Sequence, residues 1–157
     1  MKKIFIILFV VCIPVVRLMA QKFPLGIFDA QTEIGSAKKG SCNYNTQSQE
    51  YTITGSGTNI WATHDEFQFL YKKMSGDFML TTNAAFIGKG VEEHRKWGWM
   101  VRQSLDTSSP HVNAVVHGDG LTSFQFRRTA GTATEEQKST LTHADVVMLE
   151  RKGNRYY

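Results

Sequence analysis

Apolar and polar residues alternate with a period of two over much of this chain, and no other feature constrains the fold as strongly. Successive side chains of a β-strand point to opposite faces of its sheet, so this period indicates strands that bury one face. Val112, Ala114 and Val116, for example, share a face. Six segments show the pattern: residues 66–73, 76–86, 96–104, 111–117, 121–128 and 146–152.

Turn-forming residues separate these segments. Gly, Pro, Asp and Ser gather at residues 75–77, 105–110 and 118–120, and residues 153–154 fit a short hairpin turn. No segment combines helical periodicity with capping residues, and residues 132–139 are expected to form a polar loop. The sequence therefore predicts an all-β fold, an antiparallel β-sandwich.

The first twenty residues have the pattern of a secretory signal peptide. Two lysines precede an apolar stretch over residues 4–16, and the small residue Ala20 ends the segment. The alternative is an uncleaved membrane anchor, although the apolar stretch is short for a membrane span. We expect cleavage after residues 1–20, with residues 21–157 forming one domain. This domain would be periplasmic or extracellular, with no membrane span after cleavage.

Removal of the signal peptide also changes the net charge of the protein. The whole chain has a formal net charge of +4, to which Lys2, Lys3 and Arg17 contribute three positive charges, and no acidic residue precedes Asp29. The mature chain is therefore close to neutral, at +1. Bulk charge gives no support to a nucleic-acid partner.

The last segment, residues 146–157, is expected to form a strand, a turn and the start of a return strand. Only three residues follow the turn, whereas a complete strand usually has about five residues or more. We therefore expect the sandwich to be truncated at its C-terminus, with its last strands missing.

The faces opposite the apolar ones present hydrogen-bonding side chains on consecutive strands. Guanidinium, amide, imidazole and carboxylate groups of this kind match the hydroxyls of a sugar. Two interpretations stay open: a ligand surface, or the ordinary solvated face of an antiparallel sheet. Arg102 and Arg127 would repel each other unless an anion, Glu150 or a ligand lay between them. The candidate ligand-binding residues are Arg102, Asn113, His117, Gln125, Arg127 and Glu150.

The stretch GSGTNIWATHDEFQFLY, residues 55–71, crowds polar groups at the entry to a predicted core strand. Trp61, His64 and Asp65 are candidate rim contacts for a ligand. Asp65 and Glu66 are adjacent, so on a regular strand they point to opposite faces and do not serve one reaction. We interpret the cluster as the entry to a strand rather than as a catalytic centre.

No arrangement typical of an enzyme stands out in the sequence. Glycosidases need two carboxylates at a fixed separation, whereas the acids here are scattered. A Gly-x-Ser-x-Gly nucleophile elbow is absent, and the five histidines lack paired metal-ligand spacing. We therefore predict no catalytic residue, no metal and no cofactor, and we lean against an enzyme.

Three stretches of the sequence resemble a known family. They are GSGTNIWATHDEFQFLYKKMSGDFML, GKGVEEHRKWGWMVRQSLDTSSPHVNAVVHGDGLTSFQFRR and LERKGNRYY. Together they are similar to the concanavalin A-like lectin/glucanase sandwich of secreted bacterial proteins, most of all to the domain that precedes a TolB-type β-propeller in Tol biopolymer transport-like proteins. The resemblance covers residues 23–157 and implies a jelly-roll sandwich, bacterial export, a C-terminal propeller in the parent protein and a family without established catalysis. Carbohydrate binding follows only by analogy of fold.

These observations predict an exported, non-catalytic binding module that recognises a carbohydrate or cell-envelope polymer on its polar sheet face. Two alternatives stay open. One is a glycoside hydrolase-like domain, suggested by the fold and by Glu150 on the same surface as His117. The other is a protein–protein accessory domain of a Tol-type propeller protein, which an apolar patch left by the missing strands would fit.

Overall fold

The computed structural model describes residues 25–157, so the predicted signal peptide lies outside the described residues. Within this range every regular element is a β-strand and no helix occurs, which confirms the predicted all-β fold. The strands are β1 (Ala30–Ile34), β2 (Ser41–Asn45), β3 (Glu50–Thr54), β4 (Ile60–Trp61), β5 (His64–Asp65), β6 (Phe67–Tyr71), β7 (Phe78–Asn83), β8 (Lys96–Arg102), β9 (His111–His117), β10 (Leu121–Arg127), β11 (Glu135–Thr142), β12 (Val146–Lys152) and β13 (Arg155–Tyr156).

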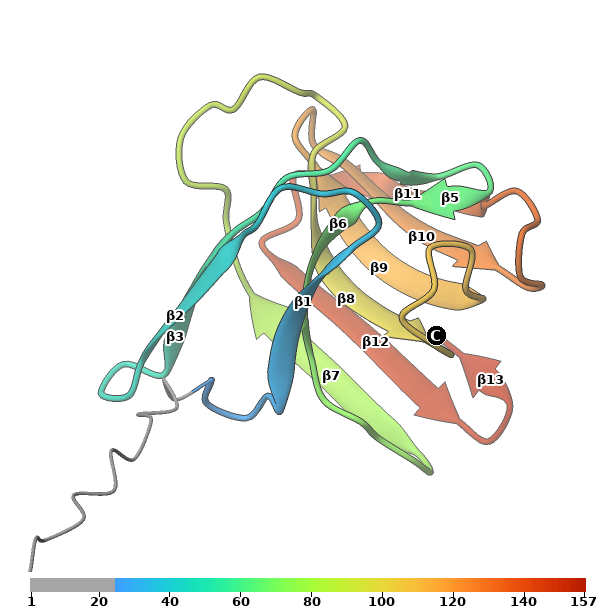
Figure 1. The fold of residues 1–157 in the computed structure, drawn as a ribbon, viewed down its shortest axis with the longest axis horizontal. Helices are drawn as coiled ribbons and strands as arrows, with labels where there is room; N and C mark the ends of the chain where they lie inside the picture. Colours follow the sequence, from blue (N-terminus) through green and yellow to red (C-terminus); the bar gives the residue numbers. More distant parts are fainter. Residues whose placement is uncertain (1–24) are drawn as a thin grey trace, which may run out of the picture.

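Two sheets form the body of the molecule (Figure 1). The larger sheet has four strands in the order β11-β10-β9-β8, and the smaller has three in the order β13-β12-β7. The other strands form two-stranded pairs, β1 with β6, β2 with β3 and β4 with β5. Every strand pair is antiparallel, as predicted.

All six strands expected from the period-two pattern are present. The strand pairing brings the apolar residues of β8, β9 and β10 together on one face of the four-stranded sheet, where Val112 lies opposite both Val101 and Phe126. The hairpin turn expected at residues 153–154 connects β12 to β13. The pattern succeeds here because each of these strands has one distinctly apolar side.

The prediction of a polar loop over residues 132–139 was wrong. Residues 135–142 form β11, the edge strand of the four-stranded sheet beside β10. Most of this strand is exposed, so it does not need alternating apolar residues. Backbone pairing with β10 and a hydrogen bond between Gln125 and Glu136 hold it instead. Strands β1, β2 and β3 were also missed.

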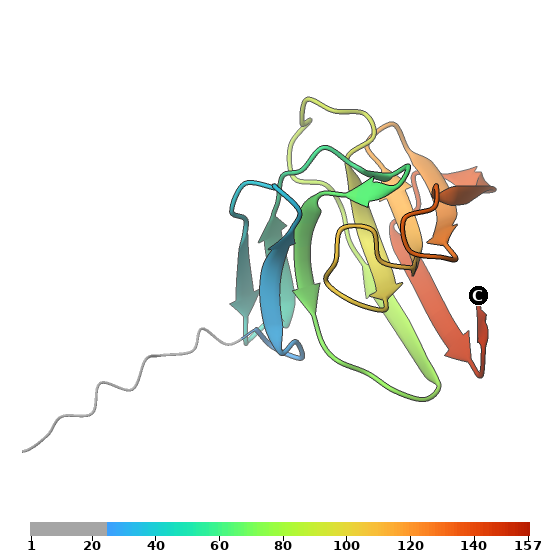
Figure 2. The same cartoon turned by 45° about the vertical axis from the view of Figure 1, so that its right-hand side comes forward.

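The two sheets pack in layers, with β12 lying against β8 and β9. Val147 and Leu149 on β12 are buried. The β2–β3 hairpin extends away from these layers at one end of the molecule, while β12 and β13 lie at the other end (Figures 1 and 2). The arrangement resembles a sandwich, and the described residues form no closed barrel.

Candidate functional site

The polar face of the four-stranded sheet is deeply buried. Asn113 and Gln125 have no exposed area, and Arg127 is 1% exposed. His111, His117 and Ser123 on the same strands are also buried. The alternative interpretation of this face as an ordinary solvated one is therefore wrong. Buried polar groups usually have hydrogen-bond partners.

A small hairpin made by β4 and β5 covers one end of this face. Its strands pair Ile60 with Asp65 and Trp61 with His64, and Ala62 at the turn has a positive φ of 47°. The carbonyl of Ala62 accepts a 2.8 Å hydrogen bond from the amide of Thr134, just before β11. Figure 1 shows β5 lying beside the ends of β10 and β11. The hairpin is thereby fixed across the sheet.

Asp65 is the residue that the hairpin inserts into the polar face. The side chain of Arg127 donates to both carboxylate oxygens, with distances of 2.7 Å and 2.9 Å. Nη1 of Arg102 lies 3.4 Å from the same carboxylate. The anion required between the two arginines is therefore Asp65, and neither Glu150 nor a ligand is needed. Asp65 has no exposed area, so its predicted place at a rim was wrong.

The two arginines have their donors occupied by the protein itself. Besides Asp65, Arg127 donates to the carbonyls of Ala62, Thr107, Ser109 and Thr132 and to the hydroxyl of Thr134. Arg102 donates to the carbonyls of Ser104 and Asp106, and its guanidinium lies over the ring of Phe67. Carbonyl dipoles thus offset the excess positive charge of two guanidiniums on one carboxylate. We call Asp65, Arg102, His111 and Arg127 the arginine cluster.

His111 completes the arginine cluster without adding charge at neutral pH. Its Nδ1 lies 3.7 Å from a carboxylate oxygen of Asp65. The pKa of His111 is lowered to about 4, mainly by burial and in part by the neighbouring Arg127 and Arg102, against the opposing effect of Asp65. The imidazole is therefore neutral at pH 7.

A second group of polar residues lies toward the other end of the same face. The amide nitrogen of Gln125 donates to Glu136 at 2.8 Å and lies 3.3 Å from Nε2 of His117. Burial and the charge of Lys96 lower the pKa of His117 to about 4. If neutral His117 accepts at Nε2, its proton is on Nδ1. We call Asn113, His117, Gln125 and Glu136 the amide row.

Several hydrogen-bonding atoms of the amide row have no partner among the described residues. They are both amide atoms of Asn113, the carbonyl oxygen of Gln125 and Nδ1 of His117. A buried polar group without a partner costs about 1–3 kcal/mol. The amide row therefore has donors and acceptors that no described residue satisfies, whereas the donors of Arg102 and Arg127 are occupied.

The amide row reaches the protein surface at its His117 end. The ring of His94, whose side chain is 52% exposed, lies edge-on to His117 with centroids 5.9 Å apart. Lys96 and Glu136 are partly exposed at this end. Burial raises the pKa of Glu136, but the bond from Gln125, with help from Ser123 and Lys138, outweighs it and lowers the pKa. Glu136 is therefore ionised at neutral pH.

The structure separates the remaining predicted residues from this site. Glu150 lies on β12, in the other sheet, and its backbone pairs with Tyr157. β12 packs on the apolar side of the four-stranded sheet, where Val147 lines a cleft together with Ala114. The expectation that Glu150 shares the surface of His117 was therefore wrong. Trp61 and His64 are exposed on the covering hairpin.

The sequence analysis gave no correct role to three members of the site. Asp65 was expected at a rim, because its distance of 62 residues from Arg127 hid their pairing. His111 was assigned no role. Glu136 was missed because its segment was taken for a loop. Two buried arginines need a buried acid to balance their charge. This requirement was the signal in the sequence that could have indicated Asp65.

Comparisons with known proteins do not identify this protein. No protein-family model matches the chain, and no curated protein or solved structure matches it significantly. Among residues 25–157 no group of three or more His, Cys, Asp and Glu side chains is placed to hold a metal ion. The same residues include no helix that is both long and apolar enough to cross a membrane. The fold and site thus define only an all-β protein with a buried polar sheet face.

Proposed function

We propose that this protein is an exported, non-catalytic binding module of the concanavalin A-like jelly-roll class that recognises a neutral carbohydrate or cell-envelope polymer through its amide row. The observation that supports this proposal is the set of buried hydrogen-bonding atoms on Asn113, His117 and Gln125 that have no protein partner. The resemblance of the sequence to that class supports the fold and the export.

The chemistry of the amide row favours hydroxyl groups as its ligand. A hydroxyl both donates and accepts, and the row offers an acceptor on Gln125, a donor on His117 and one of each on Asn113. The charged groups of the arginine cluster are occupied by one another. A neutral polyol therefore fits better than an anion, and it would enter at the His117 end.

A glycosidase-like reaction has less support. A general acid at neutral pH needs a carboxyl whose pKa is raised. The carboxyls at the polar face are Asp65, which two arginines hold, and Glu136, whose pKa is lowered. Glu150, on which the hydrolase alternative depended, lies in the other sheet.

The test is a glycan array followed by calorimetry with the best-bound neutral glycan. We expect Asn113→Leu, which keeps the branched shape of the side chain but removes both polar amide atoms, to weaken binding by about 10- to 100-fold, since each hydrogen bond contributes about 1 kcal/mol. Met100→Leu is the matched control, because Met100 lies opposite Asn113 on β8 and shares its face. Equal affinities for wild type and Asn113→Leu would remove the amide row from the proposal.

Salt and cellular location give independent tests of the same proposal. Binding of a neutral glycan should hardly change between low and high salt, whereas an acidic polymer would dissociate as salt rises. Export predicts a mature protein that begins at Gln21, which N-terminal sequencing of the secreted material would detect. A protein that keeps residues 1–20 would contradict cleavage.

A further inference from the structure

The amide row is closed at the end where it meets the arginine cluster. Asp65 has no exposed area, Arg127 is 1% exposed and His111 is 3% exposed. His111 on β9 and Arg127 on β10 each lie two residues from a member of the row, on the same face of the sheet. The ion pair between Asp65 and Arg127, with a shortest distance of 2.7 Å, lies directly beyond the row. A ligand chain that passed along the row would have to break this buried pair, which is costly.

The hairpin of β4 and β5 lies over the same face. Ile60 is paired with Asp65, and directly opposed residues share a face, so Ile60 also faces the sheet. At the base of the hairpin, the side chain of Asn59 accepts a hydrogen bond from Lys96, the residue opposite His117 on β8. The hairpin therefore contacts the polar face from the arginine cluster to the level of His117.

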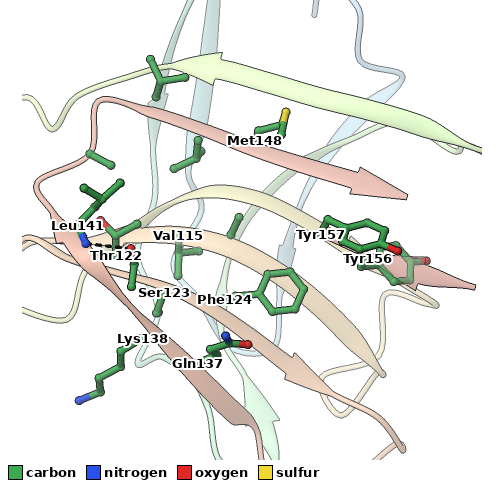
Figure 3. Close-up of a pocket in the computed structure, with 15 residues that line it drawn as sticks. Val115, Thr122, Ser123, Phe124, Gln137, Lys138, Leu141, Met148, Tyr156 and Tyr157 are labelled. Atoms are coloured by element: carbon green, nitrogen blue, oxygen red, sulfur yellow. Dashed lines mark hydrogen bonds between the residues drawn. The ribbon is translucent and has the colours of Figure 1, made fainter. Parts of the chain in front are cut away.

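The sheet itself bounds the row on the other side. Successive side chains of a strand point to opposite faces, so Phe124, next to Gln125 on β10, lies in the cleft of the apolar face shown in Figure 3. Asn113 and Gln125 lie directly opposite each other on the polar face and have no exposed area. The row is thus bounded by the sheet, by the hairpin and, at its inner end, by the arginine cluster.

The amide row approaches solvent at its His117 end. Exposure rises steeply there, since His117 is 4% exposed whereas the side chains of His94 and Lys138 are 52% and 68% exposed. The ring of His94, in the loop before β8, lies edge-on to that of His117. Exposed side chains change rotamer within nanoseconds, so His94 can turn aside while the sheet and the hairpin stay in place. A ligand that enters from this end therefore passes His94.

The unsatisfied atoms of the row lie on three neighbouring side chains. Nε2 of Gln125 lies 3.3 Å from Nε2 of His117, and Asn113 lies directly opposite Gln125. Directly opposed residues have Cβ atoms about 4.5–5.5 Å apart. The four atoms without partners on Asn113, Gln125 and His117 are therefore grouped closely enough to bind a single sugar unit.

The terminal unit of a glycan suits this geometry better than an internal unit. An internal unit is linked to a neighbour on two sides and needs two exits from its site, whereas a terminal unit needs one. A glycosidic bond also consumes a hydroxyl, so a terminal unit keeps one more hydroxyl for the unsatisfied donors and acceptors. Each polar atom left unpaired in a buried site costs binding free energy. Both the single open end among the described residues and the unsatisfied atoms favour a chain end.

We propose that the amide row binds the terminal unit of a neutral glycan chain, which enters end-on past His94, and does not bind units inside a chain. This inference rests on the proposed function, and it narrows the ligand from a neutral glycan to the end of one. The second unit of the chain then lies beside His94, and further units extend into solvent.

The test uses neutral oligosaccharides of one to six units, kept free in solution so that both chain ends are accessible, and native mass spectrometry to measure their binding. We expect the bound oligosaccharides to share a terminal unit whatever their internal units are. Beyond the second unit, affinity should rise by less than about threefold, below the contribution of one hydrogen bond.

The opposite results separate this inference from the proposed function. Binding that follows an internal unit whatever the terminal unit, or affinity that rises by about tenfold with each added unit, would overturn the inference and leave the proposed function intact. Absence of binding by every neutral oligosaccharide would overturn the proposed function, and the inference with it.

The variant His94→Ala tests the entry route. We expect it to weaken binding of the bound disaccharide by about fivefold, as for the loss of one hydrogen bond, and to leave binding of the terminal monosaccharide unchanged. Glu93→Ala is the matched control, because its side chain is the neighbouring one and is 72% exposed. This control should leave both sugars unaffected. Equal effects of His94→Ala on the two sugars, or no effect on either, would contradict entry past His94.

Discussion

The two faces of the four-stranded sheet contradict the usual relation between hydropathy and burial. The polar face, with Arg127, Asn113 and Gln125, is almost completely buried. The apolar face is less protected, since Val112, Phe124 and the other apolar residues there, apart from Val116, are only half-buried. The burial of each face in this protein therefore depends on which elements cover it and not on its hydropathy. A hairpin bonded to charged groups covers one end of the polar face, and the narrow smaller sheet covers part of the apolar face.

The polar face should therefore depend on its internal pairing for stability. Replacing Asp65 with Ala leaves two buried arginines without their carboxylate, and we expect the free energy of unfolding to fall by about 3–5 kcal/mol. Urea denaturation followed by circular dichroism measures this change. It is the largest effect that we predict, because it removes the one acid that both arginines contact.

Glu66→Ala is the matched control for Asp65→Ala. Glu66 is the next residue, carries the same charge and bonds to Thr58 outside the arginine cluster. We expect little change in stability from its removal. Equal effects of the two substitutions would mean that the arginine cluster is not what holds the polar face together.

The two buried histidines make this face sensitive to acid. Burial lowers the pKa of both His111 and His117 to about 4, below the value of about 6.5 in an unfolded chain. The unfolded state then binds more protons between these values, so stability falls as the pH falls from about 6.5 toward 4. Between pH 7 and pH 5 we expect a loss of about 2 kcal/mol for each histidine.

Urea titrations at several pH values in that range would measure the loss. His111→Phe and His117→Phe should each remove about half of the pH dependence. Carboxylates have ordinary pKa values near 4, so they contribute little above pH 5. A stability that does not change between pH 7 and pH 5 would show that the histidines are as easily protonated in the folded protein as in the unfolded chain.

Most of the fold was predictable because its central strands have strict alternation. The side chains of β8, β9 and β10 alternate between two faces, and this alternation does not depend on which strands lie beside them. The strands β1, β2, β3 and β11 were not predicted, since partly exposed strands need no apolar side. The arrangement of the sheets in layers depends on pairing between distant segments, which local periodicity does not encode.

The candidate site was only half predictable, for a related reason. Alternation places Asn113, His117 and Gln125 on one face, and that part follows from the sequence. What covers the face does not follow, because Asp65 approaches from a hairpin distant in the chain. The GSGTNIWATHDEFQFLY stretch and the arginine-bearing strands were treated as separate features, yet they meet at the bond between Asp65 and Arg127.

Removing polar atoms from the amide row should stabilise the folded protein, whereas removing Asp65 from the arginine cluster should destabilise it. Both amide atoms of Asn113 are buried without partners, so Asn113→Leu should raise the free energy of unfolding by about 1–2 kcal/mol. Urea denaturation would show a higher midpoint, while glycan binding is weakened. A destabilised Asn113→Leu protein would instead mean that Asn113 has a structural role in the folded protein.

The smallest effect is expected on the apolar face, above which the cleft opens. Phe124→Ala should lower the free energy of unfolding by about 1 kcal/mol, because a half-buried ring removes only part of its area from water. The same substitution of a fully buried Phe lowers it by roughly 3–5 kcal/mol. Val147→Ala, at a buried position of β12, should cost at least as much as Phe124→Ala although it removes fewer atoms. A loss above about 3 kcal/mol for Phe124→Ala would show that the apolar face is closed in solution, and the contrast between the two faces would then disappear.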